Sequence, residues 1–141
     1  KMTVLYSTEM AGLAAVPVSL PSGGVVDGNV RVKRSTITLA TQTTSDTIVI
    51  AKAKEGESFL YGVLTASATL GASATIAIGI TGTTGKYRAA ATFTAANTPT
   101  LFGTAAGAVT LAADEEVFIT IASASLPGSG TLVVDMYFSA T

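Results

Sequence analysis

The sequence has 141 residues, of which 48% are hydrophobic and only 12% are charged, and its formal net charge is −1. It contains no histidine and no cysteine, which excludes Ser-His-Asp triads, cysteine nucleophiles and the ligands that most often hold catalytic metals. The near-neutral charge argues against a nucleic-acid-binding surface, and no apolar run approaches the roughly 20 residues that span a bilayer. We therefore expect one non-enzymatic domain with no catalytic, cofactor-binding or metal-binding residue, and with neither nucleic acid nor membrane as a partner.

Residues 1–29 show neither the helical nor the strand period. Pro17 and Pro21 disfavour a helix and favour extended backbone before them, so we interpret this segment as an extended arm. Residues 10–20 compare poorly with a signal peptide, because Pro17 interrupts them and Lys1 is the only preceding basic residue. A disordered terminus is the other alternative. Seven apolar residues favour docking on a neighbouring subunit over disorder: Val4, Leu5, Tyr6, Leu13, Val16, Val18 and Leu20.

Residues 30–141 alternate short β-branched runs with turns rich in Gly, Pro, Asp and Ser, which is typical of an all-β sandwich or barrel. We expect about eight strands in a two-sheet antiparallel sandwich of the jelly-roll kind. Residues 88–96 could also form a helix, because alanines cluster there, but a strand is favoured. The expected runs are residues 30–40, 47–51, 59–69, 74–81, 86–93, 100–111, 117–121 and 132–138. The run at 100–111 is expected to be an irregular strand, because Gly103 and Gly107 interrupt it.

The alternation within two of these runs predicts which side chains enter the core. In residues 74–81 the isoleucines at 76, 78 and 80 share one face, while Ala77 and Gly79 leave the other face flat. Such a flat face suggests close approach of another backbone or subunit. In the last run, Leu132, Val134, Met136 and Phe138 share one face, and Val133, Asp135 and Tyr137 share the other.

Two motifs suggest chemistry only superficially. Residues 79–86 resemble a phosphate-binding loop, but Ile80 stands where a glycine is needed and Tyr87 replaces the magnesium-binding Ser or Thr, so a hairpin is favoured. Residues 114–116 are three adjacent carboxylates, which cannot converge alone on a cation or form a paired-carboxylate glycosidase site. We expect a solvated start of a strand there, or a rim contact to a basic partner.

Two further groups carry charge. If the first and last strands are neighbours, as in a jelly roll, Asp135 should pair with Arg31 or Lys33. Lys86, Tyr87 and Arg88 combine an aromatic ring with two cations and form a possible surface contact for a sugar or a carboxylate. With no tryptophan and few aromatic residues, support for a carbohydrate platform is weak.

Several segments resemble small virion proteins of tailed phages: residues 7–12 (STEMAG), 67–70 (SATL), 76–82 (IAIGITG), 85–93 (GKYRAAATF) and 126–132 (LPGSGTL). The resemblance implies a virion structural protein with a β-sandwich body. It is closest in size to capsid decoration or cement proteins, which often form trimers on the outer surface of the head. It implies the major capsid protein as the partner and carries over no catalytic or ligand-binding residue.

Three hypotheses therefore remain. The first is a capsid decoration protein that works by shape and apolar contact, which suits a chain with sparse charge and an apolar arm. The second is a receptor- or glycan-binding module of a tail or fibre, which requires an exposed aromatic and polar site near Tyr87. The third, an enzyme, is the weakest, and requires a convergent pair of buried carboxylates.

Overall fold

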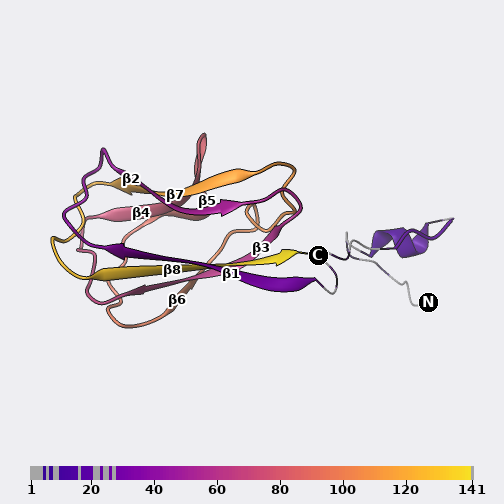
Figure 1. The fold of residues 1–141 in the computed structure, drawn as a ribbon, viewed down its shortest axis with the longest axis horizontal. Helices are drawn as coiled ribbons and strands as arrows, with labels where there is room; N and C mark the ends of the chain where they lie inside the picture. Colours follow the sequence, from indigo (N-terminus) through magenta and orange to yellow (C-terminus); the bar gives the residue numbers. More distant parts are fainter. Residues whose placement is uncertain are drawn as a thin grey trace.

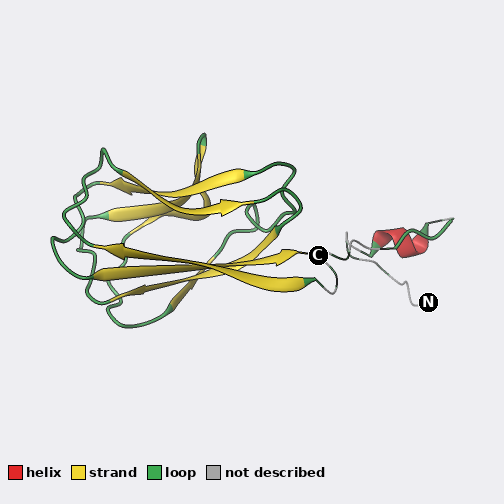
Figure 2. Ribbon diagram, viewed as in Figure 1, coloured by secondary structure: helices red, strands yellow, loops and turns green. Residues whose placement is uncertain are grey.

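In a computed structural model of the chain, residues 5, 7, 10–15, 17–20, 23, 26 and 28–140 are described. Eight strands form two four-stranded antiparallel sheets that pack face to face (Figures 1 and 2). The strands are β1 (Asn29–Thr38), β2 (Thr47–Ala53), β3 (Ser58–Ala66), β4 (Thr75–Ile80), β5 (Thr83–Ala91), β6 (Thr100–Phe102), β7 (Glu115–Ala122) and β8 (Thr131–Ala140).

The strand order is that of a jelly roll. One sheet has the order β1-β8-β3-β6 and the other β2-β7-β4-β5. The first strand thus pairs with the last, the second with the seventh, the third with the sixth and the fourth with the fifth. This is the arrangement produced when a long hairpin folds over into two sheets. The expected eight-stranded antiparallel sandwich is confirmed.

Alternating apolar residues build the core between the sheets. In β8 the four residues expected inside, from Leu132 to Phe138, are all buried, and in β7 the same holds for Val117, Ile119 and Ile121. Ile76 and Ile78 of β4 are also fully buried. Because alternate strand residues point to opposite faces, each of these rows covers the inner side of its sheet.

An aromatic cluster joins the two sheets at the centre of this core. The ring of Phe59 lies 4.7 Å from that of Tyr87, 5.6 Å from that of Phe138 and 6.2 Å from that of Phe102. Gly62, in β3, leaves room for the Phe102 ring, because a Cβ atom at this position would overlap the ring. Phe59 therefore connects β3, β6 and β8 with Tyr87 of the opposite sheet.

The hairpin of β4 and β5 confirms the strand interpretation of residues 88–91 and the hairpin interpretation of the loop-like motif. Its two-residue turn places Gly82 at φ +84°, a conformation that glycine adopts without steric cost. The flat face at Gly79 is occupied by the same chain, since a Cβ atom there would overlap the carbonyl oxygen of Thr83. The close backbone approach is thus internal to the hairpin.

One expected strand is wrong over most of its length. Residues 100–111 form a strand only from Thr100 to Phe102. Beyond it the chain turns, with the backbone N–H groups of Gly107 and Ala108 donating to the carbonyl oxygen of Thr104 at 3.1 and 3.2 Å. The Thr104 hydroxyl in turn donates to the Lys86 carbonyl. Local hydrogen bonds of this kind replace the strand ladder that β-branched residues alone would favour.

Part of the N-terminal arm is compact rather than extended. Residues Ala11–Ala14 form a 3-10 helix, η1, and the Gly12 carbonyl accepts hydrogen bonds from the N–H groups of Ala15 (3.2 Å) and Ser19 (2.9 Å). Pro17 does not prevent this, because it follows the end of η1. We refer to residues 10–20 as the N-terminal hook. The hook lies beyond the end of the sandwich where β1 begins and β8 ends (Figure 1).

No helix in the described part of the chain is long and apolar enough to cross a membrane.

Candidate binding surface

The outer side of the β1-β8-β3-β6 sheet carries a row of apolar side chains. Residues directly opposite in an antiparallel pair share a face, and Tyr137 of β8 lies opposite Val32 of β1 and Tyr61 of β3. Because Met136 and Phe138 point into the core, this row points outward. The surface, which we call the outer sheet face, contains Val30, Val32, Tyr61, Val63, Leu101, Val133 and Tyr137.

Four of these seven side chains, those of Val30, Val32, Tyr61 and Leu101, are exposed, and the other three are half-buried. Val32 is 54% exposed and Leu101, on the edge strand β6, is 71% exposed. A bulge between Phe59 and Tyr61 leaves Leu60 without a partner in β8, and it is also exposed. Exposed apolar side chains grouped on one face of a sheet make this face the candidate site of interaction with another molecule.

Two tyrosines form the aromatic part of the face. The rings of Tyr61 and Tyr137 are stacked, with centroids 4.6 Å apart and planes inclined by 15°. Tyr61 is exposed and Tyr137 is half-buried. Rigid aromatic side chains offer a large contact area at low entropic cost, which is why interfaces are enriched in them.

A single ion pair lies within this apolar surface. Arg34 donates from Nε to Oδ1 of Asp135 at 2.7 Å and from Nη2 to Oδ2 at 2.8 Å. Hydrogen bonding to Asp135, and then its charge, raise the pKa of the Arg34 guanidinium above its usual value. The pair neutralises the Asp135 carboxylate, which is only 7% exposed. The face therefore has no uncompensated buried charge.

The predicted neighbourhood of the first and last strands is confirmed, but the predicted partner of Asp135 is wrong. Asp135 lies opposite Arg34, whereas Arg31 lies opposite Phe138 and Lys33 opposite Met136, both of which point into the core. Lys33 instead pairs with Glu57 at 3.3 Å, and its Nζ lies 5.4 Å from the centre of the Phe138 ring. The pairing is decided by strand register, which one residue of slip reverses.

The structure places Tyr87 inside the protein, where it is not accessible to a ligand. Its side chain is fully buried, and its hydroxyl donates to Oε2 of Glu115 at 2.7 Å. Burial first, and then the hydrogen bond to Glu115, raise the pKa of the Tyr87 hydroxyl. Lys86 forms an ion pair with Oε1 of the same carboxylate. An exposed aromatic and polar site is therefore not formed around Tyr87.

Arg88 forms hydrogen bonds with the irregular part of the β4–β5 hairpin. Its guanidinium donates to the carbonyl oxygens of Ile76, of Ala91 (3.2 Å) and of Thr92 (3.2 Å). Burial lowers the pKa of this guanidinium. The register between β4 and β5 shifts twice, and Arg88 supplies donors to carbonyl groups near these shifts. A surface contact through Lys86 and Arg88 stays a prediction.

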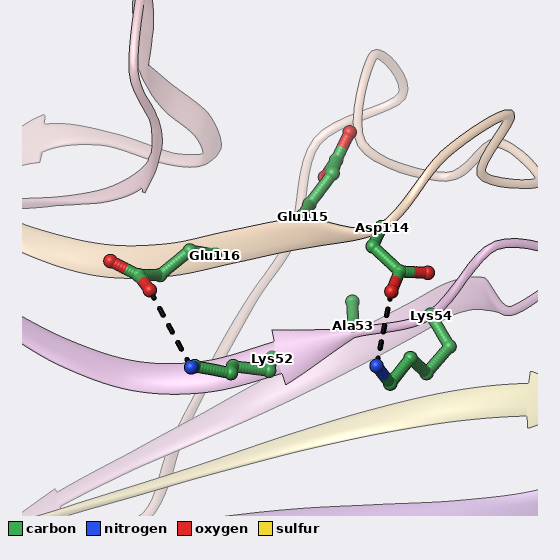
Figure 3. A pocket seen from close by; sticks show the side chains of 6 residues that line it. All are labelled: Lys52, Ala53, Lys54, Asp114, Glu115 and Glu116. Carbon is green, nitrogen blue, oxygen red and sulfur yellow. Dashed lines mark hydrogen bonds and ion pairs between the residues drawn. The ribbon is translucent and has the colours of Figure 1, made fainter.

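The acidic cluster lines a small pocket between the start of β7 and the end of β2 (Figure 3). Two of its carboxylates are exposed and paired, Asp114 with Lys54 at 3.0 Å and Glu116 with Lys52 at 3.9 Å. The Glu55 backbone N–H, and then Lys54, lower the pKa of Asp114. The prediction of a solvated start of a strand is therefore right for Asp114 and Glu116. It is wrong for Glu115, whose side chain turns toward Lys86.

This pocket has a volume of about 160 Å³, well below the roughly 300–1,000 Å³ of ligand pockets. Within the described residues, no three acidic side chains are placed to hold a metal ion. The two buried carboxylates of the described chain, Glu57 and Asp135, bind Lys33 and Arg34 respectively. Lys33 and Arg34 are neighbours in β1, and neighbouring strand residues point to opposite faces of the sheet. The two carboxylates that pair with them therefore lie on opposite faces and do not converge.

The apolar residues expected to make contacts in the N-terminal arm are partly described. Val18 is 62% exposed, Leu20 is 82% exposed, and Leu5 is also exposed. Val4, Tyr6 and Val16, and the side chain of Leu13, lie outside the described residues. The contact of this segment with a neighbouring subunit stays a prediction.

The outer sheet face was not predicted from the sequence, although one signal pointed to it. Val133 and Tyr137 alternate with the core row of the last strand, so this strand carries apolar residues on both faces. A strand that is apolar on both sides indicates that both sides are covered. Tyr61 and Leu101 belong to this face only because β3 and β6 pair beside β8, and the sequence around each of them does not indicate this.

Comparison with known proteins places this fold among capsid structures. No protein-family model matches the chain, and no curated protein matches its sequence. A chain of the cyanophage Pam1 capsid asymmetric unit has a TM-score of 0.64 and 22% identity, and the match covers 81% of this chain and 86% of that one. The protein shares its fold with phage capsid chains.

Two further solved structures agree with this result. The capsid of Ralstonia phage GP4 contains a chain with a TM-score of 0.64 and 18% identity, over 81% of this chain and 86% of that chain. The acid-stable capsid of the Helicobacter pylori bacteriophage KHP30 contains one with a TM-score of 0.60 and 9% identity, over 78% and 86%. The resemblance to phage virion proteins thus extends to the fold.

Proposed function

We propose that the protein is a structural component of a tailed-phage virion. Specifically, we propose a decoration or cement protein that binds the outer capsid surface and stabilises contacts between capsomers, without catalysis. The observation that carries the proposal is the outer sheet face, an exposed apolar surface on a fold shared with chains of three phage capsids.

The size of the outer sheet face suits a protein interface. Three strands of nine or ten residues, about 4.8 Å apart and roughly 32 Å long, with the three-residue strand β6 beside them, give a flat area of roughly 500 Å². A stable interface of standard size buries about 800 Å² on each partner. The face therefore accounts for most of one interface, and a second surface such as the N-terminal hook is needed to complete it.

The proposed partners are the major capsid protein and further copies of this chain, with a trimer favoured by the resemblance to decoration proteins. An oligomer presents the same capsid-binding surface several times, so that weak contacts combine into stable attachment. The proposal includes no nucleic acid, membrane or cofactor.

Capsid binding tests this function directly. Purified protein is mixed with capsids that lack it, the capsids are sedimented, and the number of bound copies per capsid is measured. We expect saturable binding by the full chain, and loss of binding when residues 2–20 are deleted while circular dichroism shows an unchanged β body. Protein with residues 1–141 that does not sediment with capsids would contradict the decoration function.

The matched control for surface chemistry is a pair of valines on opposite sheets. Val32 of the outer sheet face and Val49 of β2 are 54% and 50% exposed. Val32→Lys is expected to reduce the copy number on capsids, and Val49→Lys to leave it unchanged. Equal binding by both variants would show that the outer sheet face does not contribute.

A second function is favoured by one observation, the stacking of the exposed ring of Tyr61 on the half-buried ring of Tyr137. Aromatic faces of this kind bind sugar rings, so a receptor- or glycan-binding module of a tail or fibre is the alternative proposal. A glycan array with the full chain tests it, and Tyr61→Ala should remove any binding that is found. An array without hits would contradict this alternative.

A further inference from the structure

The two tyrosines of the outer sheet face are arranged for covalent chemistry between their rings. Tyr61 and Tyr137 are directly opposite in the register of β3 and β8, and opposite residues in an antiparallel pair share a face. Their ring centroids are 4.6 Å apart and the ring planes are inclined by 15°. Both side chains leave the same face of the sheet, so the carbons beside each hydroxyl lie next to the other ring.

A bulge in β3 brings Tyr61 into this pair. Before the bulge, Phe59 lies opposite Phe138. After it, Tyr61 lies opposite Tyr137, and the residue between Phe59 and Tyr61 has no partner in β8. Without the extra residue, Tyr61 would lie opposite Met136 and point into the core. Bulges of this kind re-aim a side chain and are features of the design of a sheet.

The sequence offers few competing sites for one-electron oxidation. Tyr61 is 42% exposed, so an oxidant in solution reaches its ring. The chain contains no cysteine and no tryptophan, the side chains that most readily return an electron to a tyrosyl radical. Of the other two tyrosines, Tyr87 is buried and bonded to Glu115, and Tyr6 lies outside the described residues. A radical at Tyr61 therefore has Tyr137 as its neighbouring phenol.

We infer that Tyr61 and Tyr137 form a site of oxidative cross-linking, at which a peroxide-dependent one-electron oxidant joins their rings as dityrosine. Each phenol loses one electron and one proton, and the two radicals form a carbon–carbon bond between positions ortho to their hydroxyls. The hydrogens at these positions then move to the oxygens and restore both hydroxyls. One molecule of hydrogen peroxide takes up the two electrons and two protons and becomes two molecules of water. Rings held in contact react as if at very high concentration.

The link would join β3 to β8 covalently. These strands are neighbours in the sheet, although most of the domain lies between residues 61 and 137 in the sequence. A cross-link that closes a long loop restricts the unfolded chain more than the folded one. Oxidation at this site should therefore stabilise the domain.

Treatment of the free protein with hydrogen peroxide and a peroxidase tests the site. Dityrosine is measured by its fluorescence, the mass of the product by mass spectrometry, and the position of the link by sequencing of the joined peptides. We expect a product of monomer size, lighter by two hydrogen atoms, in which residues 61 and 137 are joined. Its yield should not change on dilution of the protein, because the link forms within one chain.

Variants that keep the aromatic ring identify the phenols that react. Tyr61→Phe and Tyr137→Phe each remove one hydroxyl and retain the stack, so the yield of dityrosine should fall several-fold while circular dichroism shows a folded β body. The matched control is Tyr87→Phe, which removes a buried phenol and should leave the yield unchanged. An unchanged yield in Tyr61→Phe, or dityrosine found only in linked dimers, would overturn the inference.

Thermal unfolding measures the effect of the link. Treated protein should melt several degrees above untreated protein, and treated Tyr61→Phe should show no such rise. A rise of the same size in Tyr61→Phe would come from another oxidation and would overturn the assignment to this pair.

The cross-linking site does not depend on the proposed function, but the same reaction reports on that function. If the outer sheet face contacts the capsid, protein bound to capsids should form the link several-fold more slowly than free protein. Equal rates would contradict the proposed capsid contact and leave the cross-linking site intact.

Discussion

Arg34 and Asp135 join the first and last strands of the jelly roll by two parallel hydrogen bonds of 2.7 and 2.8 Å. The two residues are directly opposite in the register of β1 and β8, although 101 positions separate them in the sequence. A planar guanidinium that meets a carboxylate in this way fixes geometry as well as charge. The pair therefore specifies the register in which the ends of the domain close.

Replacement of Arg34 by alanine should destabilise the fold measurably. The nearly buried Asp135 carboxylate would lose its partner, which is costly for a charge in a low-dielectric setting. We expect the melting temperature to fall by several degrees, and Arg34→Lys to recover only part of the loss, because lysine lacks the two-pronged geometry. Thermal unfolding followed by circular dichroism measures both effects.

The control is Lys52→Ala, which removes an ion pair of 3.9 Å between two side chains that are both more than half exposed. Exposed pairs of this kind contribute about 0–1 kcal/mol, so the melting temperature should hardly change. If Arg34→Ala and Lys52→Ala had the same effect, the proposed role of the Arg34–Asp135 pair in fixing the register would be wrong.

Gly62 makes room for the aromatic cluster, and this can be tested with an added methyl group. In Gly62→Ala the new Cβ atom would overlap the Phe102 ring, so the ring and strand β6 must move. Overpacking of this kind costs about 1–3 kcal/mol, and we expect the free energy of unfolding in urea to fall by that amount. Gly103→Ala is the control, because the atom nearest to its added Cβ lies at 3.6 Å.

Features that repeat along one strand could be predicted from the sequence. The core rows of β4, β7 and β8 follow from strict alternation, which depends only on neighbouring residues. The jelly-roll order could also be predicted, because about eight short antiparallel strands in two sheets is the strand count of that architecture. Pairing of β1 with β8 followed from that order before any contact was known.

Features that depend on register or on irregular backbone could not be predicted. The partner of Asp135 changes from Lys33 to Arg34 with a shift of one residue in β1. Tyr87 lies in β5, whose register against β4 shifts twice, so alternation counted from Lys86 does not tell which face Tyr87 occupies. The outer sheet face combines Tyr61 and Leu101 with β8, and only the fold brings these strands together.

A substitution at Gly79 can distinguish a contact within the chain from a contact with another subunit. The flat face at Gly79 suggested close approach of another backbone or of another subunit, and the atoms that a Cβ on Gly79 would overlap belong to the backbone of Thr83 and Thr84. Gly79→Ala should therefore weaken the β4–β5 hairpin in the free protein by about 1–3 kcal/mol. Amide hydrogen exchange should show faster exchange in β4 and β5, and unchanged exchange would contradict the internal contact.

The buried Tyr87 hydroxyl should make the fold sensitive to alkaline pH. Its pKa is raised in the folded protein, whereas in the unfolded chain tyrosine ionises near pH 10. Above about pH 10 the unfolded state loses this proton and the folded state keeps it, so the free energy of unfolding falls as pH rises. Urea unfolding at about pH 8 and pH 11 measures the decrease, and comparison with Tyr87→Phe isolates the contribution of this hydroxyl.

Tyr87→Phe has two opposing effects that the pH series separates. At pH 8 the variant should be less stable by about 1–2 kcal/mol, because Oε2 of Glu115 loses its hydrogen-bond donor in a half-buried site. At pH 11 the difference should shrink or reverse, since phenylalanine has no proton to lose. A difference between the two proteins that stays constant from pH 8 to pH 11 would show that the Tyr87 hydroxyl titrates as freely in the fold as in water.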